Sequence, residues 1–400
     1  MSDPAAHLMR LTNLIEIKHG FAFASEFFGS LGEFILLTPG NFHETGGYRD
    51  LSNAQKRYSG PIPSSFVLKK GDVLIAMTEQ SPGLLGSTIK VPQNGIYLHN
   101  QRLGLLIIQK PDLVCPNYLY HVFNAPHVRK EISSTSSGTK VKHTSPTKLS
   151  AIEVFLPPIE EQQKVAAILD EWDSAIQKTE QLVAAKVRRL RHFRNTLLRS
   201  PGRASRFKLH AVTQELTRRN GNTLGREAIM AVTRQVGMRP MRGETIAANI
   251  ERYKLVPPRA FAYNPMRLNI GSIAMSRFDS DVLVSPDYVV FACDESRLLP
   301  GYLHHLRFSQ SWRNHLNLAG NGSVRVRIYY DDLGTFSFDL PSTEVQAGII
   351  RYLDAAERDI KLLNQQIETL REQKRGLMRK LLTGQWRLPL PQSAPESEPA

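Results

Sequence analysis

The sequence predicts a mixed α/β protein in which one unit occurs twice, each copy a globular domain followed by a long α-helix, with the two helices forming an antiparallel coiled coil. Three observations predict this fold: a repeat at a constant offset, a heptad stripe at the end of each copy, and short β-branched and aromatic segments before each stripe. At 400 residues and 45.1 kDa, the chain is long enough for two separate cores.

The repeat is visible without gaps over the second half of each copy. Residues of the first copy return 184 positions later, at Pro116 and Pro300, Tyr118 and Tyr302, Leu119 and Leu303, His121 and His305, Leu169 and Leu353, and Asp170 and Asp354. Gly86 and Ser87 align with Gly271 and Ser272 at an offset of 185. We therefore expect the two copies to share one fold and to differ in the details of their structure.

Each copy ends in a helix whose apolar residues are spaced alternately three and four apart. The predicted seam comprises Leu169, Trp172, Ile176, Val183, Leu190 and Leu197 in the first helix and Leu353, Ile360, Ile367, Leu370, Leu377 and Leu381 in the second. Because both stripes lie in one chain, we expect each helix to bury its stripe against the other. About 40 residues make a rod of roughly 60 Å. The alternative is that each stripe packs on its own domain.

The domain boundaries follow from these helices. We predict a first globular domain at 1–157, a helix at 158–200, a second globular domain at 201–341, a second helix at 342–384 and a disordered tail at 385–400. The strand-like segments within the globular domains are Phe66 to Met77, Ile96 to Ile108, Val282 to Ala292 and Val324 to Tyr330.

The charge balance is the first indication of function. Lys and Arg total 51 against 37 Asp and Glu, which gives a net charge of +14 and a pI near 9.8. A dense basic block lies between Arg203 and Arg259. Such a surplus favours a polyanionic partner, with nucleic acid the leading candidate, although a basic protein can also carry charge unrelated to binding.

Motifs for catalysis are missing. We find no phosphate-binding P-loop, no Rossmann glycine fingerprint, and only the first pair of a methyltransferase-like loop at Asn264 and Pro265. Two cysteines and the scattered histidines give no metal-ligand spacing, so we expect no metal site. No apolar run reaches membrane-spanning length and no secretory signal is visible, so we expect a cytoplasmic protein without membrane contact.

Two motifs carry a resemblance to a known family. The run from Leu156 to Gln163, which opens the first helix, and the closing segment from Leu377 to Gly384 resemble the conserved regions of the specificity subunits of type I restriction-modification enzymes. The stretches from Tyr263 to Ile270 and from Val284 to Phe291 are similar to the target-recognition domains of that family.

The resemblance implies a non-catalytic DNA-recognition subunit. Each target-recognition domain would read one half of a bipartite, asymmetric sequence in double-stranded DNA, and the helices would fix the distance between them. Two copies of a methyltransferase (modification) subunit would bring S-adenosylmethionine and methylate adenine, and restriction subunits would bring ATP, Mg and translocation, so this chain needs no cofactor. The alternatives are a coiled-coil protein-interaction scaffold with incidental charge and a fused methyltransferase or nuclease, which would be active without partners.

Candidate DNA-contacting residues are polar or basic and lie on predicted loops. They are Gln80, Asn100, Gln101, Arg102, Thr139, Lys140, Lys142 and His143 in the first copy, and Arg218, Arg219, Asn220, Arg239, Arg242, Asn321, Ser323, Arg325 and Arg327 in the second. The alternative for each is an ordinary solvated turn.

Three further features have structural interpretations. His121 and His305 are expected to be structural, and Trp172 is expected to be a core residue or an anchor for a partner subunit. We expect the basic helix ends, which include Arg194, to complement the helix dipoles.

Overall fold

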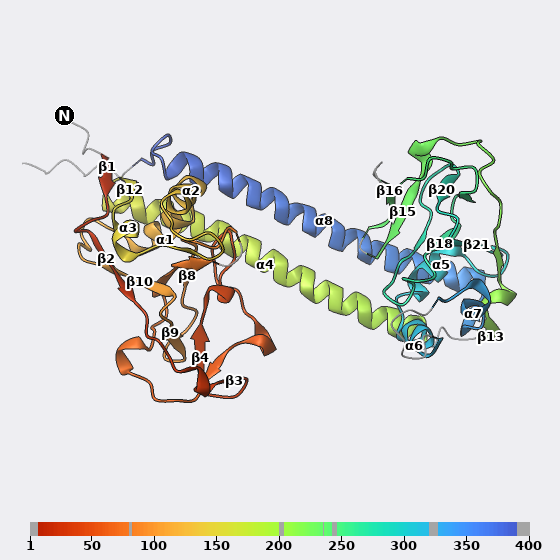
Figure 1. Ribbon diagram of the computed structural model, residues 1–400, viewed down its shortest axis with the longest axis horizontal. Coiled ribbons are helices and arrows are strands. Elements are labelled where there is room, and N and C mark those ends of the chain that lie inside the picture. Colours follow the sequence, from red (N-terminus) through yellow and green to blue (C-terminus); the bar gives the residue numbers. More distant parts are fainter. Residues whose placement is uncertain are drawn as a thin grey trace, which may run out of the picture. The chain divides into compact units, whose positions relative to one another are not determined.

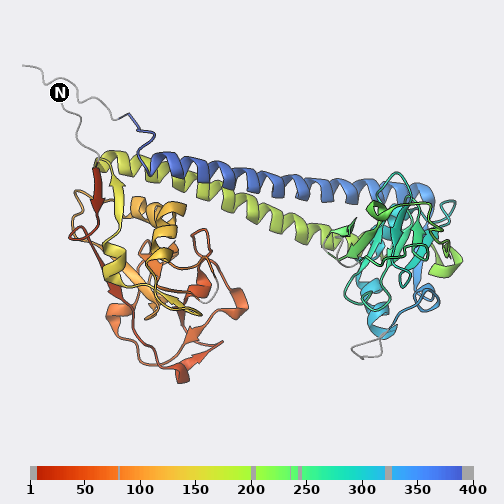
Figure 2. The ribbon, with the colours of Figure 1, turned by 45° about the horizontal axis from the view of Figure 1, so that its top comes forward.

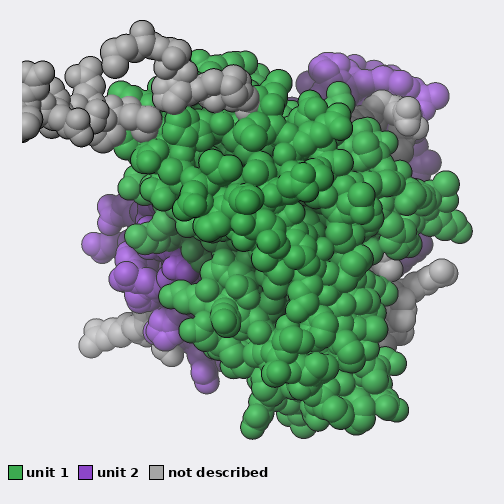
Figure 3. All heavy atoms as spheres, turned by 90° about the vertical axis from the view of Figure 1, so that its left-hand side faces the viewer, with its two compact units in different colours: residues 1–178, 366–400 green, residues 179–365 purple. Residues whose placement is uncertain are grey.

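The chain divides into two compact units. The computed structural model describes residues 7–79, 82–199, 204–234, 236–241, 246–319 and 327–389 (Figure 1). Unit 1 comprises residues 1–178 and 366–400, and unit 2 comprises residues 179–365; Figure 3 shows the two in different colours. Each unit therefore contains one globular domain together with one end of each long helix.

Unit 1 is built around short antiparallel strands. Its main sheet has the order β2-β10-β6-β8, a second sheet has the order β3-β5-β4-β9, and the pairs β1-β12 and β11-β7 are separate. Among the ladders of the described residues of unit 1, the β4-β9 ladder alone is parallel, with Ile35 opposite Tyr97. The strands are β1 (His7–Arg10), β2 (Ile15–His19), β3 (Phe28–Gly29), β4 (Phe34–Leu37), β5 (Arg57–Tyr58), β6 (Val73–Ala76), β7 (Thr78–Glu79), β8 (Thr88–Lys90), β9 (Tyr97–His99), β10 (Leu103–Ile108), β11 (Lys142–His143) and β12 (Glu153–Leu156).

Unit 2 repeats part of this plan. Its four-stranded sheet has the order β14-β21-β18-β19, and β13-β22, β15-β16 and β17-β20 are two-stranded. The strands are β13 (Ala204–Lys208), β14 (Thr213–Glu215), β15 (Met230–Thr233), β16 (Gly237–Pro240), β17 (Lys254–Val256), β18 (Phe261–Tyr263), β19 (Ile273–Met275), β20 (Val282–Val284), β21 (Val289–Cys293) and β22 (Ser337–Pro341). The main sheets correspond strand by strand, and β1-β12 corresponds to β13-β22, so the predicted repeat is present in the fold.

The short helices begin where the sequence places helix-starting signals. In unit 1, α1 (Pro116–Asn124), α2 (Pro126–Ser134) and α3 (Pro146–Ser150) each start at a proline, whose fixed φ and missing N–H suit the first helical position. In unit 2, α5 (Pro300–Leu306) starts in the same way and is followed by α6 (Gln310–Ala319) and α7 (Tyr330–Gly334).

The two long helices are α4 (Ile159–Leu197) and α8 (Thr343–Leu381), each of 39 residues. In unit 1, Leu169 of α4 shares a core with Leu381 and Leu382 at the end of α8, and the two segments lie side by side in Figures 1 and 2. In unit 2, Leu190 near the end of α4 shares a core with Leu353 near the start of α8. Within each unit the helices therefore pair in antiparallel fashion.

The residues of the predicted seam are buried or half-buried. Leu169, Leu190, Leu353, Ile367 and Leu381 are buried, with exposed fractions between 0% and 7%. The remaining seam residues are half-buried, namely Trp172, Ile176, Val183, Leu197, Ile360, Leu370 and Leu377. No described helix combines the length and the apolar composition that a membrane span requires.

Two predictions about the local structure are wrong. The strand predicted at Val324 to Tyr330 falls partly outside the described residues, and its described part leads into α7 instead, because Asp332 accepts a hydrogen bond from the Tyr329 N–H at the helix start. The disordered tail predicted at 385–400 is ordered over residues 385–389. There Arg387 forms an ion pair with the buried Glu161, whose carboxylate also accepts the Leu388 N–H. Residues 390–400 lie outside the described part of the chain.

Candidate nucleic-acid interface and the repeated helix junction

The loop between Ser137 and His143 presents the first group of predicted DNA contacts. Ser137 and His143 pair through two backbone hydrogen bonds of 3.0 and 2.8 Å, and Gly138 adopts a φ of +97°, a conformation that favours glycine. Thr139 and Lys140 are exposed at the tip of this loop, and His143 is exposed at its end. Lys142 is half-buried and donates a hydrogen bond from Nζ to Ser133 Oγ at 3.0 Å. Lys140 is thus the most accessible cation of this loop.

The second predicted group of unit 1 lies in the turn before β10. Gln101 and Arg102 are exposed, but Asn100 is only 6% exposed, and its Oδ1 accepts the Arg102 N–H at 3.0 Å. The Asn100 side chain stabilises its own turn and does not present itself to DNA, which corrects the prediction for this residue. Gln80 lies outside the described residues.

In unit 2 the predicted basic residues are mostly exposed. Arg218, Arg219 and Arg239 are exposed, Arg239 on β16. Asn220 is 1% exposed, and its side-chain amide hydrogen-bonds backbone groups of its own turn. For example, its Oδ1 accepts the Leu224 N–H at 2.9 Å. The prediction for Asn220 is therefore corrected for the same reason as that for Asn100: the side chain of asparagine readily hydrogen-bonds the backbone of its own turn.

The loop expected to match Ser137 to His143 is described only at its end. Arg327 is exposed, and its guanidinium donates a hydrogen bond to the Tyr329 hydroxyl at 3.4 Å. Arg242, Asn321, Ser323 and Arg325 lie outside the described residues. The exposed candidates remain predictions of DNA contact.

A glutamine that the site predictions missed fixes each globular domain to its long helix. Gln162 has no exposed surface; its Oε1 accepts the Cys115 N–H at 3.0 Å, and its Nε2 donates to the carbonyls of Leu113 and Pro157. Gln346 makes the equivalent three hydrogen bonds, to Leu299 N–H, Arg297 C=O and Pro341 C=O. Its recurrence at the offset of 184 was the signal that could have singled it out.

A buried histidine makes a second repeated contact at the same junction. His121 Nε2 lies 2.8 Å from Asp170 Oδ1, and His305 Nε2 lies 2.8 Å from Asp354 Oδ1. Neither histidine has exposed surface, and burial lowers the pKa of both. The structural interpretation of the two histidines is consistent with this geometry.

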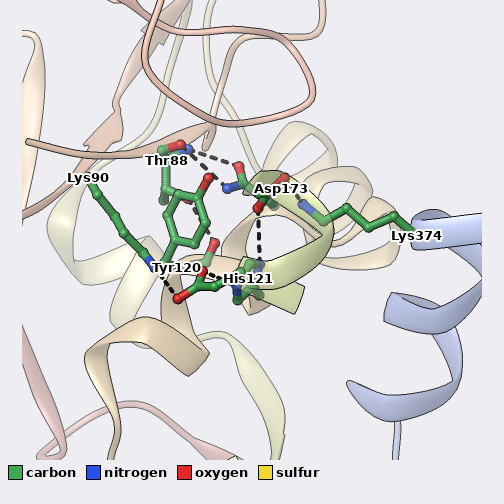
Figure 4. A network of polar contacts seen from close by, with 8 residues as sticks. Thr88, Lys90, Tyr120, His121, Asp173 and Lys374 are labelled. Carbon is green, nitrogen blue, oxygen red and sulfur yellow. Dashed lines mark hydrogen bonds and ion pairs between the residues drawn. The ribbon is translucent and has the colours of Figure 1, made fainter. Parts of the chain in front are cut away.

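In unit 1, two lysines balance the charges around this contact (Figure 4). Lys90 of β8 lies 2.7 Å from Asp170 and over the ring of Tyr120, and Lys374 of α8 lies 2.5 Å from Asp173. Burial opposes ionisation of Asp170, but the hydrogen bonds from His121 and Lys90 outweigh it and lower the pKa of this carboxyl.

In unit 2, arginines at other positions of the repeat supply the positive charge. Arg194 of α4 forms an ion pair with Glu357 of α8, so its role is to join the helices and not only to complement the α4 dipole. Arg277 and His304 also approach Glu357, at 3.9 and 3.8 Å. Hydrogen bonding and the positive neighbours overcome burial and lower the pKa of Glu357 to about 2.

These clusters contain the atoms of a possible metal site. His121, Asp170 and Asp173 bring ligand atoms within 4.8 Å of one another, as do His304, His305 and Glu357. However, Lys90 and Lys374 already neutralise the two aspartates, and Arg194 neutralises Glu357. The donor sets therefore fit ion-paired junctions better than a cation site.

Comparisons with known proteins agree with this architecture. Residues 7–185 match the model of the type I restriction modification DNA specificity domain. The EcoBI specificity subunit of Escherichia coli is 26% identical over 190 residues, which cover 47% of this chain and 36% of that protein. The StySPI specificity subunit of Salmonella potsdam is 24% identical over 137 residues, 34% of this chain and 29% of that protein.

Two solved structures share the fold over nearly the whole chain. The type I restriction-modification S subunit from M. genitalium has a TM-score of 0.61 at 11% identity and covers 96% of this chain and 98% of its own. A chain from a structural study of complex assembly and conformational transition in the type I restriction-modification system has a TM-score of 0.54 at 15% identity, over 96% of this chain and 100% of its own.

The sequence matches to the curated relatives span about a third of their length. The motifs at the starts of the helices, the duplicated fold and the family match nevertheless agree. The chain is therefore similar to type I restriction-modification DNA specificity subunits, in sequence over residues 7–185 and in fold over nearly its whole length.

Proposed function

We propose that this chain is the DNA-recognition subunit of a type I restriction-modification complex, in which each globular domain reads one half of a bipartite, asymmetric DNA target. The observation that carries the proposal is the duplication itself: two units share a sheet order and a helix junction but expose different basic residues. Unit 1 exposes Arg102 and Lys140, whereas unit 2 exposes Arg218, Arg219 and Arg239. Two domains with the same fold but different exposed basic residues are suited to reading different half-sites.

In this proposal the long helices act as a spacer. A helix of 39 residues is about 58 Å long at 1.5 Å per residue. Two modules that read one face of B-DNA lie about 34 Å or one helical turn apart, or a multiple of it. Helices of this length are sufficient to enforce such a separation.

Catalysis is assigned to partners in the same proposal. Two modification subunits would bind S-adenosylmethionine and methylate adenine, and restriction subunits would bind ATP and Mg and translocate and cleave DNA. This chain would contribute sequence recognition and the attachment surface, without a cofactor of its own, in the cytoplasm.

The proposal is tested by selection from random duplexes. The full chain, purified with its modification subunits, is incubated with a pool of random double-stranded DNA, and the bound fraction is sequenced. We expect enrichment of a single split motif, and an affinity that falls linearly in log K against log salt, as expected for several phosphate contacts.

The same experiment distinguishes the alternative of an interaction scaffold. A scaffold whose positive charge is incidental would enrich no motif, and any association with DNA would be the same for all sequences. An enzyme without partners would instead modify DNA when the chain is incubated alone. Either result would overturn the proposal.

A further inference from the structure

Unit 2 contains a cavity beside its helix junction. The cavity has a volume of about 260 Å³ and lies between the β15-β16 hairpin, the end of β19 and the segment that follows it, α5 and α8. Its polar lining consists of Arg234, Arg277, Arg307, His304 and Glu357. Its apolar lining includes Met238, Met275, Phe278 and Phe308.

The charges around this cavity do not balance. Of the described residues that line it, three carry guanidinium groups, Arg234, Arg277 and Arg307, and one carries a carboxylate, Glu357, which leaves a formal surplus of two positive charges. Burial keeps His304 and His305 neutral near pH 7 by lowering the pKa of both.

The arginines are also incompletely hydrogen-bonded. Arg307 donates from Nη1 to the Ile273 carbonyl at 2.7 Å, but its Nε and the Nε of Arg194 are buried without a partner in the described part of the chain. Burial, together with the positive charges of Arg194 and Arg277, lowers the pKa of Arg307 to about 9. Buried cations without matching anions are costly, so the site favours an added negative group.

Unit 1 provides an internal comparison. At the repeat-equivalent positions, Lys90 of β8 stands where Met275 of β19 lines the cavity, and the apolar Phe123 stands in place of Arg307. Two lysines face two aspartates there, so the formal charges cancel. The surplus of positive charge is therefore a feature of unit 2 and not of the junction as such.

We propose that the cavity beside α5 and α8 in unit 2 binds a phosphoryl group. Guanidinium forks pair with tetrahedral oxyanions through two parallel hydrogen bonds, and the surplus of two charges matches a phosphate dianion. The volume exceeds that of one phosphate, and the walls formed by Phe278 and Phe308 leave room for the group to which it is attached. That group is either a small phosphorylated molecule or the backbone of bound DNA.

The test is a calorimetric titration of the full chain with inorganic phosphate at constant ionic strength. We expect saturable binding at one site, weakened at least tenfold in the double variant R234Q/R277Q. Both residues lie at the cavity; Arg234 is exposed, and the side chain of Arg277 is 67% exposed, so their replacement leaves the core intact. The control R351Q/R358Q removes two exposed charges of α8 outside the cavity and should bind phosphate as the parent does.

A second titration with saturating duplex DNA identifies the source of the phosphoryl group. If DNA supplies it, duplex abolishes phosphate binding, and R234Q/R277Q lowers the salt slope of DNA binding by about one for each DNA phosphate that the variant no longer neutralises. If a small molecule supplies it, phosphate binds equally with and without DNA.

The proposal is overturned if phosphate binding does not saturate, or if R351Q/R358Q weakens it as much as R234Q/R277Q does. The first titration contains no DNA, so its outcome is independent of whether the chain recognises a DNA sequence.

Discussion

The helix junctions of unit 1 and unit 2 keep the same glutamine, histidine and aspartate but surround them with different charges. Gln162 and Gln346 make equivalent hydrogen bonds, and His121 and His305 each bind an aspartate at 2.8 Å. Around this shared frame, unit 1 balances lysines against aspartates, whereas unit 2 crowds arginines around Glu357.

This comparison distinguishes two sets of residues. The shared glutamine, histidine and aspartate attach each domain to its long helix, whereas the differing charges around them determine what each domain can bind. The shared contacts are buried and hydrogen-bonded, so they fix the junction in both units. The divergent charges surround these shared contacts and range from the exposed Arg277 to the largely buried Arg194 and Lys374.

The largest effect is expected from replacing the buried glutamines. Q162L and Q346L each leave one backbone N–H and two carbonyls without their hydrogen bonds, at about 1–3 kcal/mol for each group, so we expect each variant to lose at least about 3 kcal/mol in the free energy of unfolding. Urea unfolding, with hydrogen exchange of α1 and α5 to identify the unit, measures the loss.

The matched control is Q163L, at the exposed neighbour of Gln162, which should change stability by less than about 0.5 kcal/mol. If Q346L were harmless while Q162L was costly, the two junctions would not be equivalent.

Acidification is the next largest effect. Burial lowers the pKa of His121, His304 and His305, and that of His99 to about 4, whereas unfolded histidines titrate near 6.5. The unfolded chain therefore binds more protons below pH 6.5, and stability must fall as pH decreases from 7 to 5, by about 1–2 kcal/mol for His99 and for His305, whose pKa values lie at about 4. The junction of unit 2 contains two of these histidines, His304 and His305, whereas that of unit 1 contains His121 alone. We therefore expect acidification to accelerate hydrogen exchange in α5 more than in α1. Stability that rose on acidification would contradict these burial effects.

A smaller effect is expected from neutralising the aspartates. Asp170 binds both His121 and Lys90, whereas Asp354 binds His305, so D170N should cost about 1–2 kcal/mol and D354N less. Both carboxylates are more than a third exposed, and solvent screening limits the loss. Urea unfolding with D359N as the control, which removes only the more exposed ion pair with Lys186, tests the order. A larger loss for D354N would reverse the assignment of the two networks.

The smallest effect concerns single DNA contacts. K140A at the loop tip of unit 1 and R239A on β16 of unit 2 should each lower the slope of log K against log salt by about 0.9 and leave the unfolding midpoint unchanged. K361A, at an exposed position of α8, serves as the charge-matched control in the same binding assay. An unchanged slope for both K140A and R239A would place the DNA elsewhere on the units.

The sequence was sufficient for the repeat, the long helices and their seam, because periodicity and a constant offset report directly on burial. It was insufficient for Asn100 and Asn220, since exposed and turn-capping asparagines have the same local sequence signature. Tertiary contacts also hold residues 385–389 in place. There Arg387 forms an ion pair with the buried Glu161, which lies far away in the sequence. The surplus of arginines around Glu357 depends on residues that come together only in the folded unit.

Sequence recognition by this chain can be measured in the adenine methylome of a host that has no adenine methylation of its own and expresses the modification subunits with or without this chain. We expect methylation at one split, asymmetric motif when the chain is present and none when it is absent, and exchange of residues 201–341 for another such domain should change one half of that motif. Methylation that is the same with and without the chain, or a change in both halves on exchange, would contradict this expectation.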